Sequence, residues 1–221
     1  AFASSASALF QTVLTPYVAF FVVDAGVCKD LASPGYYAAY LTSAEHVGRV
    51  ATSYAWGRYS DLRGRAQVME QALLVIAVGS LVLGWTLDFR VAVATRFLMG
   101  CFDSTWSMCK AYAGSQFRDA PRAQARAMAS LGASYGLAML VGPAMGGLLA
   151  RPAEEYPALG LRETSLLARR PYLLPNVMCA LFATVAWTAT RRVLRDREKL
   201  PMKAPPHGVV KEVVVPEQQQ Q

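Results

Sequence analysis

Charged residues are scarce and unevenly distributed in this sequence of 221 residues. They make up 17% of the chain against 54% hydrophobic residues, which is too apolar for an intrinsically disordered protein. Four stretches contain no Asp, Glu, Lys, Arg or His: residues 1–23, 71–87, 127–150 and 172–190. A helix needs roughly 20 mostly apolar residues to cross a bilayer core, so each stretch predicts a membrane span. A large soluble helical bundle is the alternative, but the uncharged run from Ala127 to Ala150 would leave a soluble helix no face for solvent.

Histidine and cysteine are too few and too scattered to suggest an enzyme or a metalloprotein. His46 and His207 lie far apart in the sequence, and no nucleophile and base pair can be assembled around them. We therefore expect no catalytic residue, no cofactor and no metal site. The cysteines show no C-x-x-C spacing and lie in or near apolar segments, which favours packing roles over metal ligation or disulfides. They are Cys28, Cys101, Cys109 and Cys179.

The positive charge is concentrated on one side of the predicted membrane topology. A net charge of +7 would suit a nucleic-acid partner, but no basic patch with interleaved aromatic residues is present, so none is expected. With residues 58–65 placed in the cytoplasm, fourteen of the Lys and Arg residues fall on that side and six on the other. This asymmetry follows the positive-inside rule. It predicts an integral, multi-pass membrane protein with both termini cytoplasmic, in the plasma membrane or equally in a vacuolar or other organelle membrane.

Two further segments, about 33–57 and 91–112, have the length and flanks of spans although charges interrupt them. The first apolar segment has no charged n-region and is too long for a signal peptide, which is its alternative interpretation. We thus predict an all-α polytopic membrane domain over residues 1–195 and a disordered cytoplasmic tail over 196–221. The six predicted helices cover residues 4–24, 34–57, 67–87, 91–112, 126–149 and 172–190.

Charges inside the predicted spans are the most informative residues. A charged side chain near the bilayer centre costs roughly 2.5–3.5 kcal/mol on insertion scales, so these groups must face a protein interior. Glu45 and Arg49 are four residues apart and can pair along one helix face. A polar stripe in the fourth span follows three- and four-residue steps through Arg96, Gly100, Asp103, Ser107 and Lys110. We expect both stripes to line a central cavity. The candidates for substrate or proton coupling, with static ion pairing as the alternative, are Glu45, His46, Arg49, Arg96 and Asp103.

Two glycine-containing stretches have physical interpretations of their own. In GRYSDLRGR, residues 57–65, Gly57 and Gly64 permit a tight turn. Asp61 can then pair with Arg65 or accept from the N-terminus of a neighbouring helix, which would make the turn a breakable latch. In the fifth span, glycines four residues apart offer small surfaces for close helix contact, and Pro143 favours a bend.

Three motifs in these regions resemble those of the major facilitator superfamily and occur in the same order. The cytoplasmic loop motif G-x-x-x-D-x-x-G-R consists of Gly57, Asp61, Gly64 and Arg65, with Arg63 inside it. The fourth span contains R-F-L-x-G at residues 96–100. The antiporter-type motif of the fifth span comprises Gly136, Gly142, Pro143, Gly146 and Gly147. The segments LLARPAEEYP at 148–157 and PYLLPN at 171–176 are similar to the branch of zinc-induced facilitator-like and tetracycline-resistance-like proteins.

This resemblance implies half of a major facilitator fold, built from two inverted three-helix repeats. It also implies proton-coupled, antiporter-like transport of a small organic solute, a drug-like compound or a metal chelate, with the lipid bilayer, protons and a second six-helix half as partners. The chain departs from the family where Asp103-Ser104 replaces Asn-Gly and where Gln116 replaces an acid, which puts the cytoplasmic charge latch in doubt. The second half is expected to follow in a longer chain, to be a second copy of this chain, or to be a separate protein. A truncated membrane protein that binds or regulates a full-length transporter is the alternative function.

Overall fold

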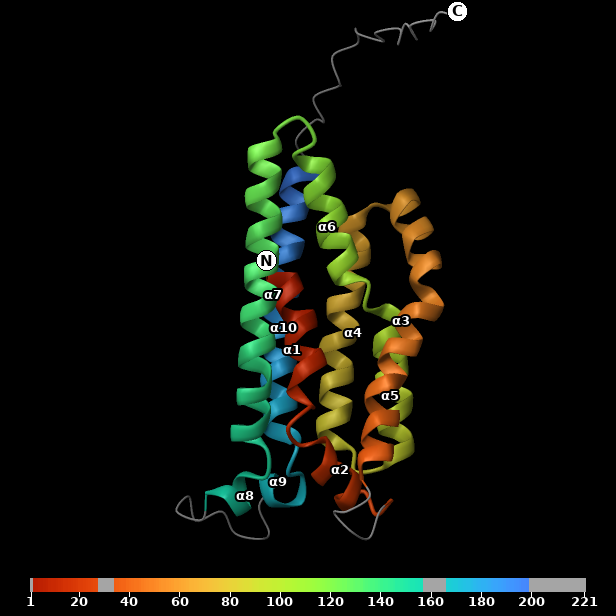
Figure 1. Ribbon diagram of the computed structural model, residues 1–221, viewed down its shortest axis with the longest axis vertical. Coiled ribbons are helices and arrows are strands. Elements are labelled where there is room, and N and C mark those ends of the chain that lie inside the picture. The colour runs from red at the N-terminus through yellow and green to blue at the C-terminus, as the bar shows by residue number, and fades with distance from the viewer. Residues whose placement is uncertain (1, 28–33, 157–165, 199–221) are drawn as a thin grey trace, which may run out of the picture.

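The computed structural model describes residues 2–27, 34–156 and 166–198, and every regular element in those ranges is a helix (Figure 1). This confirms the predicted all-α class. The helices are α1 (Phe2–Val13), α2 (Val18–Asp24), α3 (Gly35–Arg63), α4 (Arg65–Trp85), α5 (Phe89–Phe102), α6 (Thr105–Gln116), α7 (Pro121–Leu149), α8 (Pro152–Glu155), α9 (Leu166–Arg169) and α10 (Leu173–Glu198).

The long helices lie side by side along the long axis of the molecule (Figure 1). Among the described residues, α4, α7 and α10 are each long and apolar enough to cross a membrane, and α1 with α2 forms a fourth candidate if the bent pair is one span. These four coincide with the four uncharged stretches. The α3 helix and the α5–α6 pair, which carry the internal charges, complete the six predicted segments when each broken pair is counted once.

The first segment is broken, although the sequence predicts a single helix over 4–24. The α1 and α2 helices are bent by 53° relative to each other. Pro16 lies in the break and has no N–H to donate to a helical hydrogen bond. Two tight backbone bonds of 3.1 Å replace the helix there, from the Thr15 amide to the Thr12 carbonyl and from the Tyr17 amide to the Leu14 carbonyl.

The fourth segment is also broken, at Asp103 and Ser104, although the sequence predicts one helix over 91–112. Asp103 leaves the helical region with φ −82° and ψ 80°, and its Oδ1 accepts from the Thr105 amide at 3.3 Å. The Cys101 carbonyl, close to the break, accepts instead from two α3 side chains, Thr52 Oγ1 at 2.7 Å and Trp56 Nε1 at 2.5 Å. Side chains of a neighbouring helix thus satisfy the interrupted backbone, as the interior of a membrane protein requires.

The predicted cytoplasmic turn over 57–65 is much shorter than expected. The α3 helix continues to Arg63, six residues past its predicted end, and Gly57 lies within it. One helical glycine costs only about 1 kcal/mol relative to alanine, and no proline follows it before the turn. Gly64 alone makes the turn, with φ +90°, a conformation that favours glycine.

The packing between helices has the pattern expected of two related three-helix units. With each broken pair counted once, the first unit is α1–α2, α3 and α4, and the second is α5–α6, α7 and α10. The first segment of the first unit, α1, packs on α7, the second helix of the other unit. Correspondingly α5, which begins the second unit, packs on α3, while α4 packs on α10. The first segment of each unit is the one that is broken. This pattern agrees with the predicted pair of inverted three-helix repeats.

The last helix is longer than predicted and extends into the predicted tail. The α10 helix begins at Leu173 and runs to Glu198, beyond the predicted end at residue 190, and so includes the first residues of the predicted tail. Residues 199–221, and with them most of that tail, lie outside the described residues.

Three of the four cysteines can be compared with the prediction that they are packing residues. Cys101, Cys109 and Cys179 are free thiols, and the latter two are buried, whereas Cys28 lies outside the described residues.

Candidate functional site

The charged residues of α3 and α5 meet in one chain of alternating sign. Arg96 Nη1 donates to Glu45 Oε2 at 2.7 Å. Glu45 Oε1 accepts from Arg49 Nη2 at 2.6 Å, and the same Arg49 nitrogen donates to Asp103 Oδ2 at 2.8 Å. The predicted pairing of Glu45 with Arg49 along one helix face is therefore present, and the structure joins it to both charges of the fourth segment. We call Glu45, Arg49, Arg96 and Asp103 the charge network.

Close approach of α3 and α5 positions these side chains. A Cβ atom on Gly100 would overlap the Glu45 carbonyl, and one on Gly48 would lie 2.9 Å from the Cys101 amide nitrogen. Only glycine at both places lets the two backbones come this near. Short side-chain bridges between the helices follow from that proximity.

Helix α1 closes the network at its Asp103 end. Ser7 Oγ donates to Asp103 Oδ2 at 2.8 Å. Gln11, one turn further along α1, donates from Nε2 to Ser7 Oγ at 3.0 Å and reaches Asp103 Oδ2 at 3.4 Å. The break between α5 and α6 thus places a carboxylate where α1 and α3 both bind it.

Arg96 is the most deeply enclosed member. Its side chain is 1% exposed, and its guanidinium lies over the Phe10 ring, 4.4 Å from the centroid. Nη1 also donates to the Phe10 carbonyl at 3.3 Å, whereas Nε and Nη2 have no hydrogen-bond partner among the described residues. Arg96 therefore depends on Glu45 for its charge compensation.

The network is electrically balanced, but most of its charged groups are buried away from water. It contains two carboxylates and two guanidiniums, and Glu45, Arg96 and Asp103 are almost fully buried. Burying ions in a low dielectric is unfavourable unless each finds a partner, and removing one partner leaves an uncompensated charge. Protonation of a carboxylate here would therefore change which side chains bind one another and which helices they connect.

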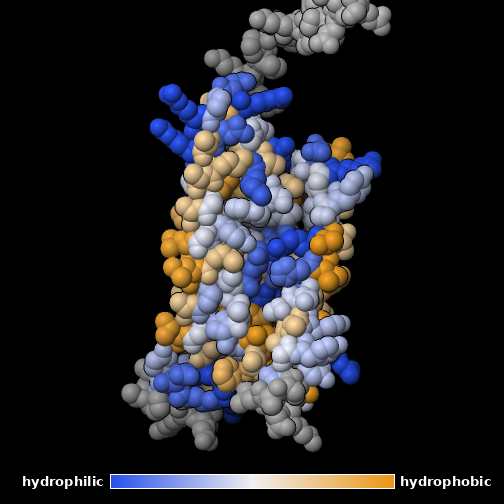
Figure 2. Space-filling model, in the orientation of Figure 1, coloured by the Kyte–Doolittle hydropathy of each residue, from blue (hydrophilic) through white to orange (hydrophobic). Residues whose placement is uncertain are grey.

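Arg49 is the solvent-exposed member of the network. Its side chain is 31% exposed, compared with 1–2% for the network's other members. Figure 2 shows hydrophilic atoms gathered at mid-height on one face, between two columns with hydrophobic surface. Tyr135 of α7 borders the Asp103 end of the network, because its hydroxyl donates to Gln11 Oε1 at 3.0 Å and Gln11 reaches Asp103.

His46 does not join the network. Its side chain is exposed, and its Nδ1 lies 3.1 Å from the Thr42 carbonyl oxygen of its own helix. His46 therefore lies on a different face of α3 from Glu45 and Arg49. Among the five candidates in the spans, the structure brings four together and leaves His46 apart.

The cytoplasmic loop motif is arranged differently from the expected latch. Asp61 and Arg63 are exposed on the last turn of α3. Arg65 turns toward α6, where its Nη1 donates to the Ala111 carbonyl and, at 2.7 Å, to Ser115 Oγ. Within the described residues no carboxylate lies within 4.0 Å of Arg65. The expected pair between Asp61 and Arg65 is absent there because Arg65 instead connects the start of α4 to the end of α6.

The antiporter-type motif of α7 is divided between two surfaces. A Cβ on Gly142 would overlap Thr12 Oγ1, and one on Gly146 would overlap the Val13 carbonyl, so both glycines pack closely on α1. Gly147 lies near Pro16, whereas a Cβ on Gly136 would have no described atom within 4 Å beyond its own helical turn. Pro143 is accommodated inside the continuous helix. Much of this small-residue surface is therefore occupied within the chain.

Sequence reasoning missed the uncharged members of the site. Ser7 and Gln11 lie in a stretch without charge, which by its composition predicts only a span. Their four-residue spacing in an apolar helix was the available signal, because a polar stripe within a span needs a polar partner. Nothing in the sequence pointed to Tyr135, whose role depends on how α7 packs against α1.

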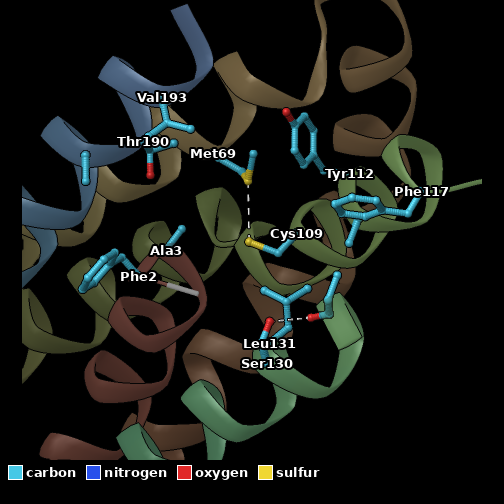
Figure 3. Close-up of a pocket in the computed structure, with 13 residues that line it drawn as sticks. Phe2, Ala3, Met69, Cys109, Tyr112, Phe117, Ser130, Leu131, Thr190 and Val193 are labelled. Carbon is cyan, nitrogen blue, oxygen red and sulfur yellow. Dashed lines mark hydrogen bonds between the residues drawn. The ribbon is translucent and has the colours of Figure 1, made fainter. Parts of the chain in front are cut away.

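A separate cavity of about 280 Å³ lies between α1, α4, α6, α7 and α10 (Figure 3). Its walls are mainly apolar, and Cys109 Sγ lies 3.6 Å from Met69 Sδ within it. No charged side chain lines this cavity among the described residues. Across the same part of the chain, no three His, Cys, Asp or Glu side chains are grouped to hold a metal ion. Among the described residues, the buried charged side chains are Glu45, Arg96 and Asp103, all members of the charge network.

Comparison with known proteins agrees with this arrangement. The profile of the Major Facilitator Superfamily matches residues 1–215. The chain is 36% identical over 170 residues to Protein ZINC INDUCED FACILITATOR 1 of Arabidopsis thaliana, covering 77% of this chain and 34% of that protein. It is 32% identical over 187 residues to Protein ZINC INDUCED FACILITATOR-LIKE 1 of the same plant, covering 85% and 38%.

A fungal relative extends the similarity. The Major facilitator superfamily multidrug transporter mfsB of Aspergillus fumigatus is 30% identical over 166 residues, 75% of this chain and 27% of that protein. The chain thus spans about a third of the length of these relatives. The matched profile, the relatives and the apolar helices lead to the same conclusion. The chain is an integral membrane protein that belongs to the Major Facilitator Superfamily.

Proposed function

We propose that this chain is one half of a proton-coupled secondary transporter, antiporter-like, for a small organic solute, a drug-like compound or a metal chelate. The observation that carries the proposal is the buried charge network, which connects three helix segments through ionisable groups. Ionisable residues inside a membrane are costly, and their usual roles are proton relays and solute pathways. The relatives named as facilitators and as a multidrug transporter support the same class.

Asp103 is the proposed proton acceptor. In its ionised form it binds Arg49 of α3 and Ser7 of α1 at once. Protonation removes its negative charge, which weakens the bond to Arg49 while Glu45 retains that arginine. The ionic link between Asp103 at the α5–α6 break and Arg49 of α3 would then be lost, so loading with a proton is coupled to a change in helix contacts.

A second six-helix half is proposed to cover the face on which Arg49 is exposed. Transporters of this superfamily work by rocking two halves about a solute site between them. The other half is supplied by a longer chain, a second copy or a separate protein. Helix α7 is available for such a contact, because only 22% of its most apolar stretch is buried, compared with 56% for α4.

Proton movement in proteoliposomes tests this function. Vesicles containing the complete transporter, which is this chain together with its second half, and the pH dye pyranine are challenged with ethidium, 2-naphthoate and zinc citrate as probes. We expect at least one probe to move protons, and we expect Asp103→Asn to reduce that flux at least tenfold, about 1.4 kcal/mol in the barrier. Asp119→Asn is the matched control, since Asp119 is an exposed carboxylate outside the network and outside the three motifs, and it should stay within about twofold.

Two results would contradict the proposal. One is unchanged proton flux in Asp103→Asn, which would make the network a static set of ion pairs. The other is the absence of proton flux with every probe in the unmodified protein.

A further inference from the structure

Two aromatic rings lie next to the charge network without being part of it. Trp106 of α6 and Tyr135 of α7 have ring centroids 4.4 Å apart and planes inclined by 38°. Both side chains are only partly buried. Tyr135 is hydrogen-bonded to Gln11, which in turn reaches Asp103. The two partly exposed rings therefore lie beside the Asp103 end of the network.

Lys110 lies one turn further along α6, next to Trp106. Its Nζ is 4.9 Å from the centroid of the Trp106 ring, and the residue is exposed. None of the described carboxylates lies within 4.0 Å of that nitrogen. Arg49, by contrast, is already bound to Glu45 and Asp103. Lys110 thus presents a cation whose observed neighbour is a ring face.

An anion would be a stronger partner for Lys110 than the ring. A ring face offers the ammonium only the weak attraction of its quadrupole, whereas a carboxylate compensates the charge and also accepts a hydrogen bond from it. The charge network is neutral as a whole, whereas Lys110 carries a positive charge with no described carboxylate within 4.0 Å. Moving Lys110 toward an anion would also uncover the Trp106 ring for stacking.

We propose that Trp106, Tyr135 and Lys110 form a binding site for a flat aromatic carboxylate. The carboxylate binds the Lys110 ammonium, and the ring of the ligand lies against Trp106 and Tyr135. This inference rests on the proposed transport function in one respect, because it names the class of solute. Through Tyr135 and Gln11, the ligand is linked to the residue proposed to take up the proton.

Three related probes separate the two features of the ligand. Binding is measured by isothermal titration calorimetry at neutral pH with the full chain in lipid nanodiscs and empty nanodiscs as the blank. The flat aromatic anion is 2-naphthoate, the flat aromatic cation is 2-naphthylmethylammonium, and the non-aromatic anion is cyclohexanecarboxylate. We expect 2-naphthoate to bind at least tenfold more tightly than either of the others.

Substitutions assign the binding to the proposed residues. Lys110→Gln should weaken 2-naphthoate about tenfold, and Lys110→Arg should restore most of the affinity. Trp106→Leu should remove the preference for 2-naphthoate over cyclohexanecarboxylate. The matched controls are Arg170→Gln and Trp85→Leu, because Arg170 lies over the Trp85 ring at 5.3 Å in a similar pair away from the network. Both controls should leave binding within twofold.

The outcomes distinguish this inference from the proposed function. Equal binding of the three probes, or equal losses in the control pair, would overturn the site. If Trp106→Leu is no longer monodisperse, the two Lys110 variants decide the question. Failure of Lys110→Arg to restore the binding of 2-naphthoate would then overturn the site. Proton flux with ethidium or zinc citrate but no binding of 2-naphthoate would refute only the site. Selective binding of 2-naphthoate without any proton flux would refute only the transport function.

Discussion

Two helix interfaces in this protein are both packed closely through glycines, but only one of them contains ion pairs. At the interface between α3 and α5, Gly48 and Gly100 bring the backbones together, and charged side chains bridge the helices beside them. At the interface between α1 and α7, Gly142 and Gly146 do the same without any ion pair among the described residues. The two occupy equivalent positions in the two three-helix units. Close approach is thus the shared structural requirement, and ionisable chemistry is added to only one of them.

The largest expected effect breaks the charged interface. Glu45→Gln leaves Arg96 buried without a carboxylate, which should destabilise the protein by about 3–5 kcal/mol. The measurement is the free energy of unfolding in mixed micelles. The double variant Glu45→Met with Arg96→Met removes both charges and should recover a large part of that loss. A single variant as stable as the unmodified protein would show that Arg96 is compensated in another way.

A smaller effect is expected when the close glycine packing is broken on each side. Gly100→Val would push α5 away from the Glu45 carbonyl, and Gly146→Val would push α7 away from the Val13 carbonyl. Each should destabilise the protein by about 1–3 kcal/mol, because a tightly packed interface tolerates added volume poorly. Thermal unfolding in detergent compares the two. Only the Gly100 variant should also reduce proton flux beyond its effect on stability, and equal flux losses would contradict the separation of roles.

The smallest expected effect distinguishes two glycines of α7, Gly136 and Gly142. Gly136 has the same helical setting as Gly142, but nothing among the described residues lies close to its Cα hydrogens. Gly136→Ala should therefore be neutral or stabilising by up to about 1 kcal/mol through the helix propensity of alanine. Gly142→Ala, which meets Thr12, is the matched variant and should destabilise. A marked loss of stability in Gly136→Ala would reveal a contact with a neighbouring chain.

Local patterns in the sequence were reliable where one helix decides the outcome. The uncharged stretches identified α4, α7 and α10 because a lipid environment excludes unpaired charge regardless of how helices pack. The pair Glu45 and Arg49 followed from helical periodicity alone. The turn predicted over 57–65 is confined to Gly64, because Gly57 costs the helix little and α3 continues through it to Arg63.

Contacts between helices were beyond the reach of these patterns. The break at Asp103 depends on partners that satisfy the interrupted backbone, such as Thr52 and Trp56 at the Cys101 carbonyl. The connection of Arg65 to α6 likewise depends on which neighbour lies within reach. Sequence spacing carries no information on such neighbours.

The sequence by itself determined that this is a helical membrane protein and that its internal charges must be compensated, because both follow from the cost of exposing polar groups to lipid. The tertiary structure alone decided how they are compensated. It places Glu45 between two arginines and Asp103 among Arg49, Ser7 and Gln11. The physical reason is that hydrogen bonds and ion pairs act over about 3 Å, so pairing is selected by which glycine-lined helices can come that close.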